Sequence, residues 1–175
     1  MKTKTINLYS FNELNEETQK KAIAFLTDIN TQHNWWDLTT DEMNEELTKL
    51  GFIGSKIYFS GFSSQGDGAC FICDSIDFNL FQGGKYKDLD ITANIEHRWR
   101  YYFATSTTVN LEGEVTDEQY SEIEQAIKDE REEIGNRFYK RLEDEHYYLI
   151  SDEAIKETIT ANNYLFNEDG EIDHE

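Results

Sequence analysis

The chain lacks proline altogether and has only two cysteines among its 175 residues. Turns therefore depend on glycine, asparagine and aspartate, and a framework of several disulfides is excluded. Cys70 and Cys73 lie three positions apart in an apolar stretch with the pattern of a strand. Because consecutive side chains alternate faces in a strand, the two thiols should point to opposite sides and stay unpaired. We expect both to be reduced core residues, since a thiol packs as a small hydrophobe.

Positive charge is also scarce: 36 aspartates and glutamates face 16 lysines and arginines, which gives a net charge of -20. A surface of this sign repels phosphate, so direct binding to nucleic acid is disfavoured and basic partners are favoured. No apolar run approaches the roughly 18 residues that span a bilayer. The first residues, Met1-Lys2-Thr3-Lys4, are not followed by the apolar core of a signal peptide. The sequence therefore predicts a cytoplasmic protein without a membrane partner.

Aromatic residues, by contrast, are plentiful at 14% of the chain. Large side chains in a chain of this length suffice for a well-filled core, which excludes a wholly disordered protein. No repeat and no linker divides the sequence. We therefore predict a single domain over residues 1–175, with an acidic tail over residues 164–175.

Helical spacing of apolar residues marks both end regions of the chain. Asn15 has the position of an N-cap for a helix through about Asn30. Thr39 and Glu42 have the spacing of a capping box for a second helix, which Gly51 should end. The first third is thus predicted to be a helical pair.

A long helix and a short one are predicted toward the C-terminus. Thr116 and Gln119 form a capping box before roughly seven turns with one apolar stripe. Gly135 inside this stretch costs about 1 kcal/mol relative to alanine, so a bend or a close contact is expected there. Ser151 should cap the last helix.

The middle third reads as antiparallel strands. Residues 57–73 predict a hairpin with one buried face on each strand, and residues 77–82 form a second apolar fragment. Residues 89–100 alternate most regularly, with His97 and Trp99 on the apolar face, and residues 101–111 should return as the partner strand. Helices, strands and helices in this order predict an α+β fold with one antiparallel sheet of four to five strands.

The connection within the 57–73 hairpin is the first candidate site. Its aspartate lies between two glycines, which allow positive φ and outward-facing N–H groups. Such a turn is either a hairpin requirement or a polar ledge for a small ligand. The residues that would frame a pocket for a ligand such as a nucleotide are Ser60, Ser63, Gln65 and Asp67, together with Trp35 and Trp36. A tryptophan pair beside a helix end is usually a lid on the core, and less often an exposed anchor for a partner.

No motif predicts catalysis, a metal or a cofactor. Cys70-x-x-Cys73 has no second pair of ligands at zinc spacing, and the four histidines are scattered. The segment Asn167-x-Asp169-Gly170 matches only part of a calcium loop and lacks the closing glutamate. No G-x-S-x-G elbow or phosphate-binding glycine loop is present either. We therefore predict a protein that is not an enzyme.

Acidic residues crowd the last third of the chain, and they form the second candidate site. Between residues 112 and 157 there are sixteen acidic and six basic residues. Helical spacing would place several carboxylates on one face, at intervals near the scale of phosphates along a nucleic acid. The predicted face comprises Glu118, Glu122, Asp129, Glu130 and Glu133. The alternative is a solvated helix face that only keeps the protein dissolved.

A smaller patch of the opposite sign lies in the middle third. Lys85, Lys87, Arg98 and Arg100 occur near Trp99 and Tyr101. Such a patch would suit an acidic group. Bases beside aromatic residues also commonly protect the edge of a sheet.

Two segments resemble a known group of proteins. K-I-Y-F-S-G-F-S-S-Q-G-D-G-A-C-F at residues 56–71 and H-Y-Y-L-I-S-D-E-A-I-K-E-T-I-T-A-N-N-Y-L-F at residues 146–166 are similar to small acidic proteins encoded by phages and prophages. The S-G-F-x-S-Q-G-D-G motif marks the group, and the similarity runs over most of the chain. The resemblance implies an accessory phage protein in the cytoplasm of a bacterial host, of a kind that commonly binds and blocks host machinery.

Together these observations predict a non-enzymatic phage inhibitor of a bacterial defence or nucleic-acid-handling complex, of the anti-CRISPR or anti-restriction type. Its acidic face would mimic DNA and occupy the nucleic-acid-binding groove of a basic host protein. The alternative is a small-ligand binding or sequestering protein that uses the loop between residues 60 and 68. A homodimer is also compatible with the sequence.

Overall fold

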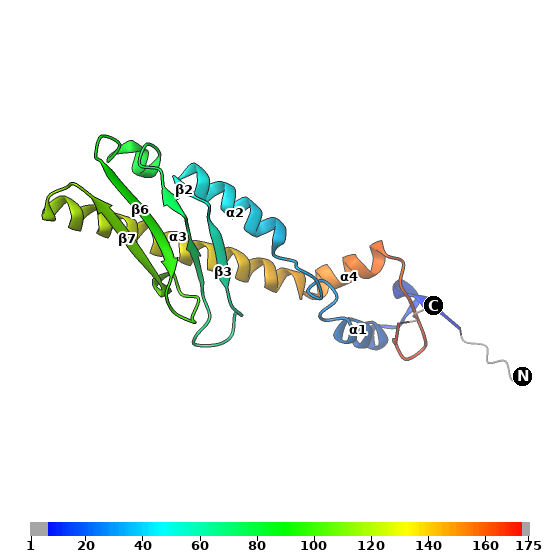
Figure 1. Cartoon of the computed structure of the whole chain (residues 1–175). Helices are drawn as coiled ribbons and strands as arrows, with labels where there is room; N and C mark the ends of the chain where they lie inside the picture. The colour runs from blue at the N-terminus through cyan, green and yellow to red at the C-terminus, as the bar shows by residue number, and fades with distance from the viewer. Residues whose placement is uncertain (1–6, 173–175) are drawn as a thin grey trace, which may run out of the picture. The chain divides into compact units, whose positions relative to one another are not determined.

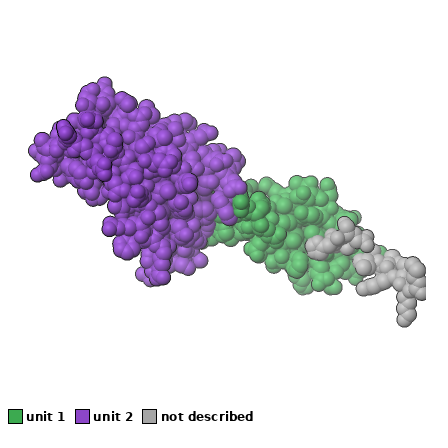
Figure 2. Space-filling model, viewed as in Figure 1, with its two compact units in different colours: residues 1–35, 144–175 green, residues 36–143 purple. Residues whose placement is uncertain are grey.

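The computed structural model describes residues 7–172, and the contacts within it form two compact units. Unit 1 comprises residues 1–35 and 144–175, and unit 2 comprises residues 36–143 (Figure 2). Each unit has buried apolar residues of its own. Whether the chain is one domain stays a prediction.

Unit 1 pairs the two ends of the chain. β1 (Tyr9–Ser10) lies antiparallel to β8 (Leu165–Phe166), beside the short 3-10 helix η1 (Phe11–Glu13). The helices α1 (Glu16–Phe25) and α4 (Asp152–Ala161) contribute to the same core. Its buried members are Phe11, Leu14, Ala22, Ile23, Ile155, Ile159 and Phe166.

The described part of the predicted acidic tail is a tight hairpin. Phe166 is fully buried and bridges to Ile172. The side-chain oxygen of Asn167 accepts hydrogen bonds from the N–H groups of Asp169 and Glu171, both at 3.0 Å. Residues 164–172 therefore belong to the folded unit, while residues 173–175 lie outside the described part.

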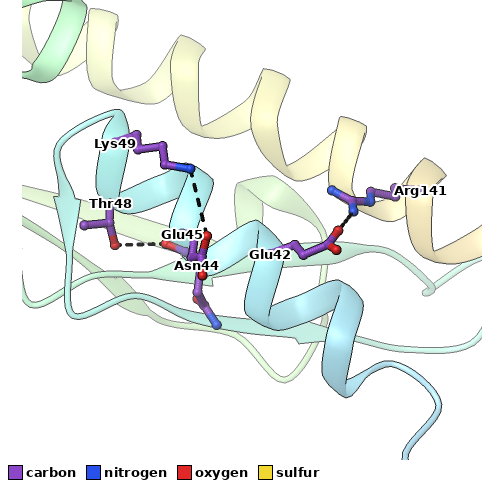
Figure 3. A network of polar contacts seen from close by, with 6 residues as sticks. All are labelled: Glu42, Asn44, Glu45, Thr48, Lys49 and Arg141. Atoms are coloured by element: carbon purple, nitrogen blue, oxygen red, sulfur yellow. Dashed lines mark hydrogen bonds and ion pairs between the residues drawn. The ribbon is translucent and has the colours of Figure 1, made fainter.

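Unit 2 contains α2 (Asp37–Lys49) and most of α3 (Asp117–Leu149) (Figure 1). α3 buries a stripe of Ile123, Ile127, Ile134, Phe138 and Leu142. Ion pairs join the two helices: Glu42 contacts Arg141 and Glu46 contacts Arg137. Figure 3 shows Glu42 of α2 and Arg141 of α3 pointing toward each other. The arginines in the second half of α3 are thereby directed to α2.

The strands of unit 2 form three separate antiparallel pairs. β2 (Phe52–Ile53) pairs with β5 (Ser75–Ile76), β3 (Lys56–Phe59) with β4 (Ala69–Ile72), and β6 (Ile91–His97) with β7 (Thr107–Gly113). Two short 3-10 helices, η2 (Phe81–Gly84) and η3 (Ala104–Ser106), lie between them in sequence.

Residues 7–172 therefore do not form the predicted single sheet of four to five strands, and that prediction was wrong. The predicted mixture of helices and antiparallel strands is confirmed. A single bridge, Cys73 to Ile95, joins the β3–β4 pair to β6 through hydrogen bonds of 3.0 and 3.1 Å. Beyond it, the N–H of Asp74 donates to Ile53 and that of Asp77 to Gly51. These bonds draw the chain to β2, so residues 77–82 enter η2 and form no strand.

Several predicted helix signals are confirmed. Asn15 accepts a hydrogen bond from the N–H of Thr18, and Ser151 accepts one from that of Ala154. Thr116 and Gln119 make both bonds of the capping box. Gly51 follows α2 with a φ of 96°, a conformation that favours glycine.

Three local predictions were wrong. α1 ends at Phe25 and not near Asn30, because residues 26–31 form successive tight turns. α2 begins at Asp37, so Thr39 is a buried residue inside the helix and not a cap. β4 buries Ala69, Cys70 and Phe71 in succession, on both faces.

The apolar side of β6 also ends earlier than predicted. Ile91, Ala93 and Ile95 are buried, but His97 is exposed and Trp99 lies beyond the strand. The chain leaves the ladder at His97 and returns at Thr107.

Candidate functional site

The loop between β3 and β4 is closed by its own aspartate. The Asp67 carboxylate accepts hydrogen bonds from the N–H groups of Ser63 and Ser64, at 2.9 and 2.6 Å. These bonds, that from Ser64 first, lower the pKa of the carboxyl group. The Ser60 hydroxyl accepts a bond from the N–H of Gly68 at 3.3 Å. A carboxylate thus already occupies the donors that a bound phosphate would need.

The other residues predicted to frame a ligand pocket have different surroundings. Trp36 packs against Phe59 with ring centroids 5.5 Å apart. It lines a groove of about 290 Å³ with Thr40, Asn44 and β3. Trp35 belongs to unit 1, where its ring lies 5.5 Å from that of His146. Gln65 is exposed at the tip of the loop.

Four of the five predicted acidic residues share one side of α3. At about 100° per residue, Glu118, Glu122, Asp129 and Glu133 fall within an arc of about 60°, and Glu130 lies about 60° farther round. By the same measure the buried isoleucines of α3 lie about 140–180° from Glu118, so Glu130 borders the buried stripe. Four of the five acidic side chains are exposed and Glu130 is half-buried. We call these five residues the acidic face.

Part of the acidic face is neutralised by nearby bases. Glu122 accepts hydrogen bonds from Lys85 at 2.7 Å and from the Tyr86 hydroxyl at 3.3 Å. The lysine hydrogen bond is the main cause of the lowered pKa of Glu122. Glu133 lies 3.7 Å from Arg137. Two of the five negative charges are therefore partly compensated.

The remaining three carboxylates have no such compensation. Among residues 7–172, no base forms an ion pair with Glu118, Asp129 or Glu130. Asp129 instead accepts a hydrogen bond from Gln125 at 2.6 Å. Arg131 points away from this face, because it is 6% exposed and donates to the backbone oxygen of Thr107 at 2.9 Å.

A surface hollow of about 550 Å³ adjoins the acidic face. Acidic residues of α3 line one part of it, and Ala126 provides apolar surface, whereas Tyr86 is only 5% exposed. Its full lining consists of Gln82, Lys85, Tyr86, Glu122, Gln125, Ala126, Asp129, Glu130 and Glu133. We call it the acidic hollow.

The basic patch predicted from sequence separates into different surroundings. Lys85 lies beside Glu122 in the acidic hollow. Arg98 and Arg100 instead follow β6, in the loop that leads to η3. This loop exposes Trp99, Tyr101 and Phe103 by 59, 47 and 39%. Sequence reasoning had placed Trp99 in the apolar face of a strand and so missed how exposed these aromatic residues are.

The thiols and the acidic groups show no arrangement for metal binding in the described part of the chain. No group of three or more His, Cys, Asp or Glu residues there is suitably placed to hold an ion. Cys70 and Cys73 are free and buried, as predicted. Burial raises the pKa of Cys70 to about 12 and that of Cys73 to about 11. No described helix has the length and apolarity needed to cross a membrane.

A family model described as Domain of unknown function (DUF8835) matches residues 35–80 and 78–152. The matched segments include all of unit 2, with both the β3–β4 loop and the acidic face. No curated protein and no solved structure matches the chain.

Proposed function

Because the chain belongs to the DUF8835 family, whose description names no activity, we propose a function from the geometry of unit 2. We infer a binding protein without catalysis, whose acidic face enters the basic nucleic-acid-binding groove of a partner protein. The observation that carries this proposal is a set of uncompensated carboxylates: Glu118 and Asp129 on the exposed side of α3, and the half-buried Glu130 farther round the helix.

The packing of α3 against the core favours a rigid charged surface. From Glu118 to Glu133 the helix rises about 22 Å, and three isoleucines beneath it are fully buried. Charges fixed in this way need little ordering when a partner binds. Arg141 pairs with Glu42 of α2 and Arg131 is buried in the core, so neither neutralises the face. Arg137 pairs with Glu46 of α2 and also contacts the face at Glu133.

The resemblance to small acidic phage proteins supports a more specific form of this proposal. A protein of that origin would inhibit a bacterial defence or nucleic-acid-handling complex by competing with DNA for its groove. Electrostatic attraction would accelerate the encounter and would weaken with salt. The small-ligand alternative stays a prediction, and the internal bonds of Asp67 give it no support.

A charge-reversal variant tests the proposal. Glu118→Lys/Asp129→Lys/Glu130→Lys should abolish capture of basic nucleic-acid-binding proteins from nuclease-treated lysate. A matched control changes three exposed acids elsewhere in unit 2 by the same amount: Asp41→Lys/Glu112→Lys/Glu114→Lys.

The control should still capture the same proteins, and the wild-type chain should displace labelled DNA from them. Equal capture by wild type and both triple variants would rule out the acidic face as the binding surface. Capture without DNA displacement would refute competition with nucleic acid.

A further inference from the structure

The loop after β6 has the composition of a protein-binding hot spot. Trp99, Tyr101 and Phe103 are among the exposed large apolar residues, and Arg98 and Arg100 alternate with them. Tryptophan, tyrosine and arginine are the residues that most often dominate the energy of an interface. We call residues 98–103 the Arg-Trp loop.

The arginines of this loop have no carboxylate partner among residues 7–172, although acids outnumber bases more than two to one in the chain. Arg98 reaches only the Thr108 hydroxyl, at 3.5 Å. Arg100 lies over the ring of Tyr101, 5.3 Å from its centroid, and contacts its hydroxyl at 3.4 Å. Both guanidinium groups therefore retain donors for an external carboxylate.

Packing beneath the loop limits its freedom. Tyr102 stacks on Tyr58 at 6.4 Å, and both rings contact His97. His97 Nε2 also lies 3.1 Å from the backbone oxygen of Tyr101. At Gly68, an added Cβ would lie 3.0 Å from the Cα of Phe103, so the loop is pressed against the end of the β3–β4 hairpin.

We propose that the Arg-Trp loop of one copy of the chain docks into the acidic hollow of a second copy. Charge complementarity identifies the occupant: the two arginines meet the uncompensated Asp129 and Glu130, while Trp99 contacts Ala126. The hollow, at about 550 Å³, is large enough for an indole side chain. This inference rests on the same acidic surface as the proposed function. The loop of a second copy would compete with the partner protein for that surface.

Because loop and hollow are different surfaces, this interface is heterologous and allows chains or rings of copies. It is also small, so the association is weak. Two bodies of net charge -20 repel at low ionic strength. At physiological salt the screening length is about 8 Å. Salt therefore weakens the long-range repulsion between two copies before it weakens the attraction between groups in close contact. Association should therefore be strongest at intermediate salt.

A second copy fits better than single-stranded nucleic acid as the occupant. Stacking on exposed aromatic rings and arginines also suits unpaired bases. A polyphosphate chain, however, extends well beyond the two arginines and meets the negative field of the whole protein. A second copy presents its carboxylates in one compact hollow instead.

Two variants and their mixture test the proposal by sedimentation velocity. Arg98→Glu/Arg100→Glu reverses the charges of the loop, and Asp129→Lys/Glu130→Lys reverses those of the hollow. Each variant alone should remain monomeric under conditions where the wild type associates. Mixed, they should form a dimer and nothing larger, because one intact loop meets one intact hollow. A mixture that stays monomeric overturns the proposal, as does a wild type that is monomeric at every salt concentration.

Controls separate this outcome from misfolding and from failure of the proposed function. Lys20→Glu/Lys156→Glu makes the same charge change as the loop variant in exposed residues and should associate like wild type. Trp99→Ala should lose association without a charge change, and circular dichroism checks folding.

The loop variant keeps the acidic face, so it should still capture basic partners even if the wild type does not self-associate. Labelled oligo(dT) provides the opposing test. Binding by the wild type that is lost in the loop variant would assign the loop to nucleic acid and overturn the proposal.

Discussion

Gly135 marks a close approach of α3 to η3 and β4, and its substitution by alanine tests this packing directly. A Cβ at this position would lie 2.6 Å from the Cβ of Ala104 and 3.1 Å from the backbone oxygen of Ala69. Both distances are well inside the 3.5–4.0 Å at which carbon atoms attract. Neither neighbour is the flexible end of a long side chain, so the backbone of η3 or α3 must shift.

Two effects of opposite sign decide the result. Replacing glycine by alanine inside a helix stabilises by about 1 kcal/mol, whereas forcing an extra methyl group into a packed core costs about 1–3 kcal/mol. Since the clash involves backbone, we expect the upper part of that range and a net loss of about 1–2 kcal/mol in the free energy of unfolding.

Urea unfolding followed by tryptophan fluorescence measures this loss. In a Trp35→Phe background the remaining tryptophans, Trp36 and Trp99, both belong to unit 2 and report its unfolding. The double variant Gly135→Ala/Ala104→Gly removes the nearer clash and should recover at least about 1 kcal/mol, as a coupling energy between contacting residues. A Gly135→Ala variant more stable than wild type would refute the close contact between α3 and η3.

Three further outcomes follow from the described contacts. Thr116→Ala should destabilise α3 by about 1 kcal/mol in urea unfolding, since it removes half of the capping box, and an unchanged midpoint would contradict this. Asp67 has a lowered pKa in the folded loop. Hydrogen-exchange protection of its two serine amides should therefore be full above the ordinary aspartate pKa and fall as the pH drops through the lowered one. Cys70 and Cys73 should resist a thiol reagent at pH 8 until urea unfolds the chain, and fast native labelling would contradict their burial.

Local signals in the sequence predicted much of the secondary structure. The caps at Asn15, Thr116 and Ser151 bind as expected, because a cap involves only residues three or so apart. The end of α1 was missed, since Asn30 makes bonds with Leu149 and Thr158, more than a hundred positions away. The acidic side of α3 was also predictable, because helical periodicity alone puts its members together.

The candidate sites likewise combine features that the local sequence predicted with features that depend on distant contacts. The sequence predicted a carboxylate turn at Asp67 but not that the turn would bind its own backbone. It grouped Lys85 with Arg98 by charge, whereas the fold pairs Lys85 with Glu122 and leaves Arg98 without a carboxylate in the described part of the chain. It likewise joined Trp35 and Trp36, which fall in different units.

Composition and periodicity by themselves determined the net charge, the helices and their buried stripes, because these depend on residue type and on neighbours within one or two turns. Only the tertiary structure decided which charges are compensated and which aromatic residues are exposed. An ion pair such as Glu42 with Arg141 joins positions 99 apart, and no local pattern encodes that meeting. The three carboxylates of the acidic face that have no base and the exposed Arg-Trp loop are therefore properties of the fold.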